Sequence, residues 1–343
     1  MEIKTSDLKS IINTVKLGLS DKQLVPGMTR FIFTGNDIVT YNGEMCIHYP
    51  LTTSFKCSVD ATKFSKTVNQ INAESLDLSF AEDVLNLKAG RISVKFSIDM
   101  QTTIIEEVIA KINEEVNADN EWKEIPTEFT SALSLVSFAA SKDKSKQTQC
   151  CIHAIDNYLL AADLYMGKVS LYEFKDVFTP FMVNAKTIAS LASMEISMMT
   201  VTKSWIHFAN EYNVIFSLRK IEGNFPYDKI FELINNVEAV NIVLPDELKS
   251  AVNMTSIFAN EDEPYIDMVI TENSITCKSQ TDEGSIEYPL DSPYKGELIS
   301  FSVDTRLISL ILGKTDNMGI DIKMRKALFE SDNLIYLVTL RRE

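Results

Sequence analysis

The feature that most constrains the fold of this chain is a motif that occurs three times at nearly equal spacing. The motif starts at Val59, Val183 and Val303, so successive copies are 124 and 120 residues apart. The copies read Val59-Asp60-Ala61-Thr62-Lys63-Phe64, Val183-Asn184-Ala185-Lys186-Thr187-Ile188 and Val303-Asp304-Thr305-Arg306-Leu307-Ile308. A period of this length is too long for one unit of a solenoid and about right for a whole domain. We therefore predict three copies of one domain in series.

A second amphipathic helix pattern repeats with the same period. Ser10, Ser131 and Ser250 hold the same place in its three copies, 121 and 119 residues apart. Strand–turn–strand patterns follow every helix, so each domain reads as two half-units of one helix and several antiparallel strands. This pattern predicts an α+β fold of three repeated domains, each with two helices packed on antiparallel sheets, with the helices on one side and the sheets on the other.

Two segments read as joints between the repeats. The charged and acidic stretch from Ile104 to Pro126 precedes the second copy, and Glu222-Gly223-Asn224-Phe225-Pro226 begins the joint to the third. We expect domain 1 at residues 1–122, domain 2 at residues 123–240 and domain 3 at residues 241–343.

The chain offers no strong constellation for catalysis, a metal or a cofactor. The acidic run Glu261-Asp262-Glu263 falls in a predicted loop, where a solvated loop is favoured over a divalent-cation site; these three residues lie outside those that the structure describes. Its three histidines are His48, His153 and His207, and the last two sit in apolar strand patterns that favour a structural role. There is no phosphate-binding glycine loop, nucleophile elbow or paired histidine motif. The five cysteines form no C-x-x-C pair, and no apolar run approaches the ~18 residues of a membrane span. We expect a non-catalytic protein with reduced thiols that is neither exported nor membrane-bound; a hydrolase using Asp or Glu clusters is disfavoured.

The distribution of basic residues decides which classes of binding partner the sequence still allows. A net charge of −15 argues against a protein whose whole surface binds nucleic acid. Any single basic residue can be explained as an ordinary solvated lysine with no role in binding. As a set, however, the basic residues gather on the predicted helices and just beyond them. The candidate DNA-binding residues are Lys9, Lys16, Lys22, Lys63, Lys66, Lys142, Lys144, Lys146, Lys186, Lys249, Arg306 and Lys314.

Repeated domains with their helices on one side can close into a ring. Sheets at the rim would pair edge to edge, and helices inside would offer lysines to the phosphates of a duplex without reading its bases. We therefore expect sequence-independent contact with double-stranded DNA.

The whole chain resembles the beta subunit of bacterial DNA polymerase III, the sliding clamp family, as a divergent or phage-encoded member. Three repeats of a helix-plus-sheet domain carry the resemblance. Ser217 to Pro226 is similar to that family's strand and acidic-Gly-x-Phe-Pro turn, and Tyr336-Leu337-Val338 followed by Arg341-Arg342 is similar to its last strand.

The resemblance implies the DNA clamp fold and a head-to-tail homodimeric ring that gives DNA polymerase its processivity. Lys22 and Lys186 match basic residues that this family places against DNA. The implied partners are duplex DNA and, through short peptides, the replicative polymerase and the clamp loader. The implied location is the cytoplasm, at the nucleoid or in a phage-infected bacterial cell.

The family's peptide cleft would correspond to positions between domains two and three. Of its Thr-Asp-Gly-His-Arg-Leu motif, only Asp163 is present. The lining would be Leu164, Tyr165, Met166, Phe225, Pro226, Ile230, Phe231, Leu337, Thr339, Leu340 and Arg341. The altered motif and the acidity leave a second hypothesis open, a clamp-fold interaction scaffold that does not encircle DNA.

Overall fold

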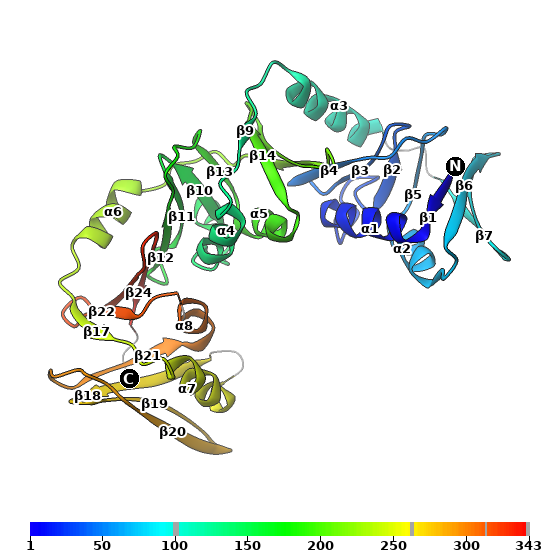
Figure 1. Cartoon of the computed structure of the whole chain (residues 1–343). Helices are drawn as coiled ribbons and strands as arrows, with labels where there is room; N and C mark the ends of the chain where they lie inside the picture. Colours follow the sequence, from blue (N-terminus) through cyan, green and yellow to red (C-terminus); the bar gives the residue numbers. More distant parts are fainter. Residues whose placement is uncertain (99–102, 261–263, 313, 341–343) are drawn as a thin grey trace. The chain divides into compact units, whose positions relative to one another are not determined.

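The computed structural model describes residues 1–98, 103–260, 264–312 and 314–340, and within them one supersecondary unit occurs six times (Figure 1). Each unit is a strand, a helix and three further strands. The first two are β1(Glu2–Lys4) α1(Thr5–Val15) β2(Arg30–Phe33) β3(Asp37–Tyr41) β4(Met45–Pro50) and β5(Cys57–Asp60) α2(Ala61–Gln70) β6(Ser75–Ala81) β7(Val84–Ala89) β8(Ile92–Ser97). The next two are β9(Lys123–Glu124) α4(Phe129–Ser137) β10(Cys151–Ile155) β11(Tyr158–Asp163) β12(Lys168–Glu173) and β13(Phe181–Asn184) α5(Ala185–Ala189) β14(Ile196–Val201) β15(Trp205–Asn210) β16(Ile215–Arg219). The last two are β17(Val240–Val243) α7(Leu248–Thr255) β18(Tyr265–Thr271) β19(Ser274–Thr281) β20(Gly284–Asp291) and β21(Ile299–Asp304) α8(Thr305–Ile311) β22(Asn317–Asp321) β23(Lys326–Glu330) β24(Leu334–Thr339).

The repeated motif is the junction between a strand and a helix. Asp60 ends β5, and its carboxylate accepts the backbone N–H of Lys63 at 2.7 Å; Asp304 accepts that of Arg306 at 2.9 Å. These are N-caps, which satisfy backbone donors that the first helical turn leaves unpaired and contribute about 1 kcal/mol each. The prediction of repeated α+β units with antiparallel sheets is confirmed.

The strands of the described residues form four antiparallel sheets. Two have four strands, ordered β1-β6-β7-β8 and β20-β19-β18-β21. Two have eight, ordered β5-β2-β3-β4-β16-β15-β14-β9 and β13-β10-β11-β12-β24-β23-β22-β17. Each eight-stranded sheet thus joins the last strands of two different units, β4 to β16 and β12 to β24.

By its internal contacts the chain divides into two compact units. One comprises residues 1–130 and 186–221, and the other comprises residues 131–185 and 222–343. The partition into three domains at residues 122 and 240 stays a prediction. It is supported by two extra helices, α3(Thr103–Asn117) and α6(Tyr227–Asn235), which follow the second and fourth units of the element order.

In the first compact unit, helices cover both faces of the eight-stranded sheet. Phe31 and Phe33 on β2 contact Phe64 of α2 edge to face, with ring centroids 5.9 and 6.0 Å apart. Ile32, which points to the opposite face because side chains alternate along a strand, joins a core with α3. Figure 1 shows α3 on one side of β2, β3 and β4, and α1 with α2 on the other. The α3 residues of this core are Ile105, Ile109, Ile112 and Val116.

The second compact unit repeats this arrangement with α6. On β12, Ser170 donates a hydrogen bond to the Leu135 carbonyl of α4 at 3.0 Å, whereas Val169 and Leu171 pack in a core that includes Ile230 and Ile234 of α6. Neighbouring residues of one strand therefore contact helices on opposite faces of the sheet. The expectation of helices on one side only was incomplete, because both joints form helices over the other face.

His153 anchors the start of α6. Its Nε2 lies 2.8 Å from the Thr148 carbonyl and must donate, so Nδ1 accepts the Tyr227 hydroxyl proton at 2.9 Å. The His153 ring also packs against Phe225 in a tilted arrangement, with ring centroids 3.8 Å apart. Burial lowers the pKa of His153 to about 4. His207 is likewise fully buried, so both histidines lie in the interior of strands as expected.

No helix in the described part of the chain combines the length and apolarity needed to cross a bilayer. Cys46, Cys57, Cys151 and Cys277 are buried free thiols, and Cys150 is half-buried.

Candidate nucleic-acid interface

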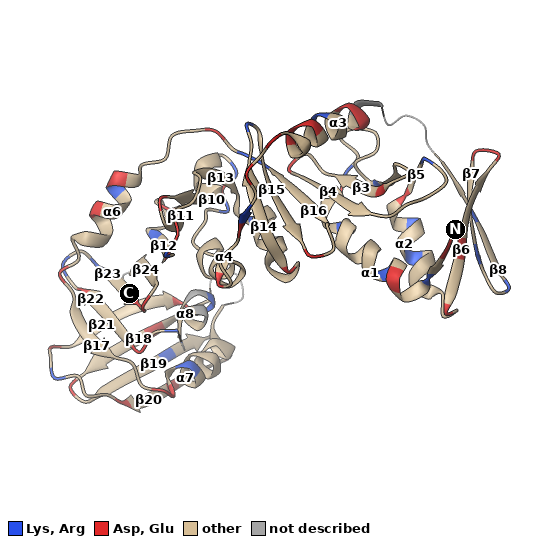
Figure 2. Ribbon diagram, turned by 45° about the horizontal axis from the view of Figure 1, so that its top comes forward, with Lys and Arg blue, Asp and Glu red and all other residues tan. Residues whose placement is uncertain are grey.

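The helices of the six repeated units differ in charge from the two joint helices. The repeated helices carry six basic residues and a single acidic one, Asp7, although the chain as a whole has a net charge of −15. By contrast, α3 has four glutamates and one lysine, and α6 has two acidic residues and one lysine. Figure 2 shows blue segments on α2 and α7 and red segments on α3. The basic residues therefore follow the repeated helices.

Most of the basic residues singled out from the sequence are exposed, and several of them also contact other groups of the protein. Lys9 on α1 is half-buried and donates to the Ile71 carbonyl at the end of α2, 2.9 Å away. Arg306 is bound to Asp304 at 2.8 Å, and this contact raises the pKa of the guanidinium while 56% of its side chain remains exposed. The exposed lysines on or just beyond repeated helices are Lys16, Lys22, Lys63, Lys66, Lys186, Lys249 and Lys314.

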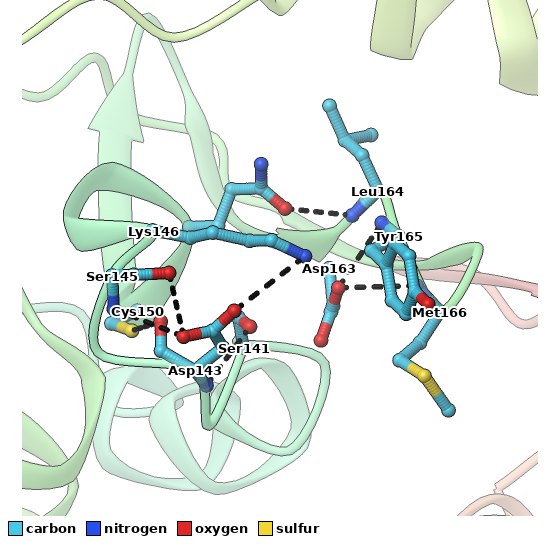
Figure 3. Close-up of polar contacts among 10 residues, drawn as sticks. Ser141, Asp143, Ser145, Lys146, Cys150, Asp163, Leu164, Tyr165 and Met166 are labelled. Carbon is cyan, nitrogen blue, oxygen red and sulfur yellow. Dashed lines mark hydrogen bonds and ion pairs between the residues drawn. The ribbon is translucent and has the colours of Figure 1, made fainter.

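The third unit is different because α4 carries no lysine. Its basic residues Lys142, Lys144 and Lys146 lie in the loop after α4, and the fold brings this loop to the turn between β11 and β12 (Figure 3). The Lys146 ammonium lies 4.0 Å from the centroid of the Tyr165 ring and 3.9 Å from the Asp143 carboxylate. The sequence placed Lys146 and Tyr165 in two separate sites, but the structure places them in contact.

The β11–β12 turn is held by specific hydrogen bonds. Asp163 is buried, and one of its oxygens accepts the backbone N–H groups of Tyr165 and Met166, each at 3.1 Å. Gly167 has φ 63°, and a Cβ there would collide with the Thr339 side chain. Tyr165 is nevertheless 81% exposed, so the turn presents its aromatic ring to solvent.

The residues expected for a partner-peptide cleft lie in three environments. Phe225, Ile230 and Leu337 are buried in the core under α6, with Leu164 and Phe231 packed against that core. Tyr165, Met166, Thr339 and Leu340 line a cavity of about 280 Å³ that also contains Lys168, Tyr265, Ser302, Val303, Asp304 and Val338. Pro226 is exposed, and Arg341 lies outside the described residues.

A larger cavity beside α6 was not anticipated. It has a volume of about 520 Å³ and lies between α6 and the β22–β23 turn. Its lining is Lys229, Glu232, Leu233, Asn236, Glu238, Asp321, Lys323, Met324 and Lys326. Nothing local in the sequence marks this cavity, because its two walls, α6 and the β22–β23 turn, are far apart in the chain.

The fold is similar to solved structures of bacterial sliding clamps. A sliding clamp (DNA polymerase III subunit beta) from Bartonella birtlesii, solved bound to griselimycin, has a TM-score of 0.81 at 15% identity, covering 100% of this chain and 99% of that chain. The sliding clamp from Bacillus subtilis has a TM-score of 0.79 at 14% identity, with 100% and 98% covered. The beta subunit from Thermotoga maritima has a TM-score of 0.77 at 16% identity, with 100% and 99% covered.

No protein-family model matches the sequence, and no curated protein matches it. The likeness is therefore one of fold over the full chain: this is the DNA clamp fold.

Proposed function

We propose that this chain, which has the fold of the bacterial DNA polymerase III beta clamps, is a divergent member of that family and works as a sliding clamp. Two copies would form a ring around duplex DNA and tether the replicative polymerase through contacts that do not depend on sequence. Such a ring needs no catalytic group, because topology rather than affinity keeps it on DNA.

The observation that carries this proposal is the set of strand edges that the chain leaves unpaired. The last strands of four units pair with one another, β4 with β16 and β12 with β24. In unit order, the first pair joins units one and four, and the second joins units three and six. In both pairs the partner lies three units further along, and three units on from unit five, counted around a ring of six, is unit two. The last strand of unit five, β20, should therefore pair with the last strand of unit two, β8. Within the described residues each of these has one strand neighbour, β19 and β7. A second copy can supply the missing pairing, and two such junctions close a ring of two chains.

The two existing junctions also predict the register of the missing one. Phe216 on β16 lies opposite Ile47, two residues before Tyr49, and Tyr336 on β24 lies opposite Ser170, two residues before Tyr172. The same rule places Phe96 of β8 opposite Ile286 of β20, two residues before Tyr288.

This register is chemically consistent. Phe96 faces Leu85 on β7, and Ile286 is on the same face as the buried Leu290, so apolar side chains meet on the core side. On the solvent side Lys95 falls opposite Glu287, and beyond the paired segment Arg91 aligns with Asp291. Opposite charges directly across an antiparallel pair contribute about 0.2–1 kcal/mol. A basic edge thus meets an acidic edge, and the contact is head-to-tail because β8 and β20 belong to different units of the chain.

The basic repeated helices support the DNA part of the proposal. Lysines on helices that cross a duplex contact phosphates and not base edges, so binding depends on salt and not on sequence. We infer that partner peptides bind in the cavity of about 520 Å³ beside α6. Its Leu233 and Met324 offer apolar contacts, and its volume falls in the ordinary range of ligand sites.

Light scattering across a range of protein concentrations tests the assembly. We expect twice the mass of the chain at high concentration and dissociation on dilution. A mass equal to one chain at every concentration would contradict the ring and favour the non-encircling scaffold.

A further inference from the structure

The strand β17 leaves one edge of an eight-stranded sheet open (Figure 1). Within the described residues its one strand neighbour is β22, and the N–H of Leu244, just after β17, donates to the Asp316 carbonyl at 2.8 Å. Hydrogen bonding alternates along an antiparallel pair, so Ile242 bonds to β22 in the same way. Asn241 and Val243 therefore direct their N–H and C=O groups toward the open edge, where no described strand pairs with them.

Two other strands hold the equivalent place, and charge protects both. β1, β9 and β17 each begin an odd-numbered unit and pair with the first strand after the helix of the next unit, β6, β14 and β22. β1 is Glu2-Ile3-Lys4 and β9 is Lys123-Glu124, whereas β17 is Val240-Asn241-Ile242-Val243 and has three of its four residues exposed. Charged side chains on an edge strand discourage pairing with a further strand. The edge of β17 lacks that protection.

The remaining edges of the described sheets are covered or already assigned. β5 and β13 each have three of four residues buried, and β21 has four of six buried. On β5 the Arg30 guanidinium also donates to the Ser58 carbonyl at 2.9 Å. β8 and β20 form the proposed ring junction. Among the described sheet edges, β17 is thus the one that is exposed, uncharged and unassigned.

The open edge is apolar, and carboxylates flank it. The side chain of Val243 is 50% exposed and that of Val240 is 42% exposed. The nearest lysines in the sequence at this end, Lys249 and Lys314, are candidate DNA-binding residues. Three exposed carboxylates lie just beyond the C-terminal end of β17, at Asp246, Glu247 and Asp316. An apolar strand with basic flanks complements this edge, whereas a second copy of the chain would bring identical acidic flanks together.

We propose that β17 binds an extended segment of a partner protein, which adds to the sheet as a ninth strand. The segment carries apolar residues flanked by lysine or arginine. Its backbone exchanges hydrogen bonds with Asn241 and Val243, and its apolar side chains cover Val240 and Val243. In this mode of recognition, main-chain hydrogen bonds give affinity and alternate side chains give specificity. The ring junction uses β8 and β20, so the two proposals stand or fall separately.

Binding of a synthetic peptide tests the site. The probe is a labelled peptide of alternating valine and threonine with a lysine at each end, and fluorescence anisotropy measures its dissociation constant. Asn241→Pro removes one N–H that faces the open edge and leaves the bonds to β22, since proline is tolerated where the nitrogen of an edge strand faces solvent. We expect binding at least about fivefold weaker. Asn241→Ala is the matched control, because it changes the same side chain and keeps the N–H.

Amide hydrogen exchange followed by NMR tests the same contact without a substitution. The N–H groups of Asn241 and Val243 should exchange rapidly in the free chain and at least about fivefold more slowly when the peptide is saturating. The N–H of Ile242, which is bonded to β22, should exchange slowly in both states. This measurement also decides the matter if circular dichroism shows that Asn241→Pro unfolds.

Three results would overturn the proposal. They are no binding of the peptide by the unaltered chain up to millimolar concentration, equal losses from Asn241→Pro and Asn241→Ala, or slow exchange at Asn241 and Val243 in the free chain. Slow exchange that appears only at high protein concentration would assign the edge to a second copy of the chain instead.

Discussion

Lys95→Glu is expected to weaken self-association of the chain about thirtyfold at low salt. The substitution replaces an opposite-charge contact with Glu287 by a like-charge one, which costs about 1 kcal/mol for each junction. A closed ring of two chains has two junctions, so the cost is about 2 kcal/mol, or about thirtyfold in the dissociation constant. Sedimentation equilibrium at two salt concentrations measures the dissociation constant. The difference between the variant and the unaltered chain should shrink at high salt because the charges are exposed.

The double variant Lys95→Glu with Glu287→Lys separates this register from a general effect of charge. It restores an opposite-charge pair across the junction and should recover much of the lost association. Recovery will be incomplete, because Glu287 also pairs with Lys278 at 2.9 Å within the sheet and that contact becomes repulsive. Lys88→Glu is the matched control, since Lys88 is an exposed lysine on the inner strand β7. Equal losses from Lys88→Glu and Lys95→Glu, with no recovery in the double variant, would refute the register.

Lys22→Glu combined with Lys186→Glu is expected to give the second large effect, on DNA. Lys22 follows the first repeated helix and Lys186 lies in the first turn of α5, and both are exposed. If each contacts one phosphate, the slope of log K against log salt falls by about 0.9 per contact, so by about 2 per chain. Affinity for duplex DNA at about 50 mM salt should fall at least tenfold, while the thermal midpoint stays unchanged.

The control for this variant changes the net charge by the same amount. Lys175→Glu with Lys203→Glu alters two exposed lysines in turns between strands rather than on repeated helices. Equal losses of DNA affinity from both pairs would show that total charge, and not the helical surface, governs binding.

The repeated architecture could be predicted from sequence because its signals are local. Asp60 and Asp304 cap the helices that follow them, and the apolar positions behind them have helical spacing, so strand, cap and helix are legible within about ten residues. The same holds for the polar turns between strands. Fold class and the order of helices and strands were therefore predictable.

The joint helices were missed although their periodicity was present. Ile105, Ile109, Ile112 and Val116 fall at i, i+4, i+7 and i+11, one face of a helix, but the surrounding glutamates made the segment read as a charged linker. Charge on the outer face of an amphipathic helix is normal, and the apolar spacing is the better guide.

The contacts that define the candidate sites depend on pairing between distant segments. The junction of β12 with β24 brings Gly167 beside Thr339, and the hairpin of β11 and β12 carries Tyr165 to the loop of Lys146. Strand pairing between units leaves no mark in either segment alone. For that reason the peptide-cleft residues that the resemblance implied lie in a buried core, in a small cavity and, for Pro226, at an exposed position before α6.

Retention on circular DNA tests the central claim most directly. Protein assembled from dissociated chains in the presence of a nicked circle is separated from free protein by gel filtration in salt high enough to remove electrostatic binding. The clamp account predicts that protein stays with the circle and is released when one cut linearises it. Release from the circle under the same conditions, or equal retention on circular and linear DNA, would contradict encirclement.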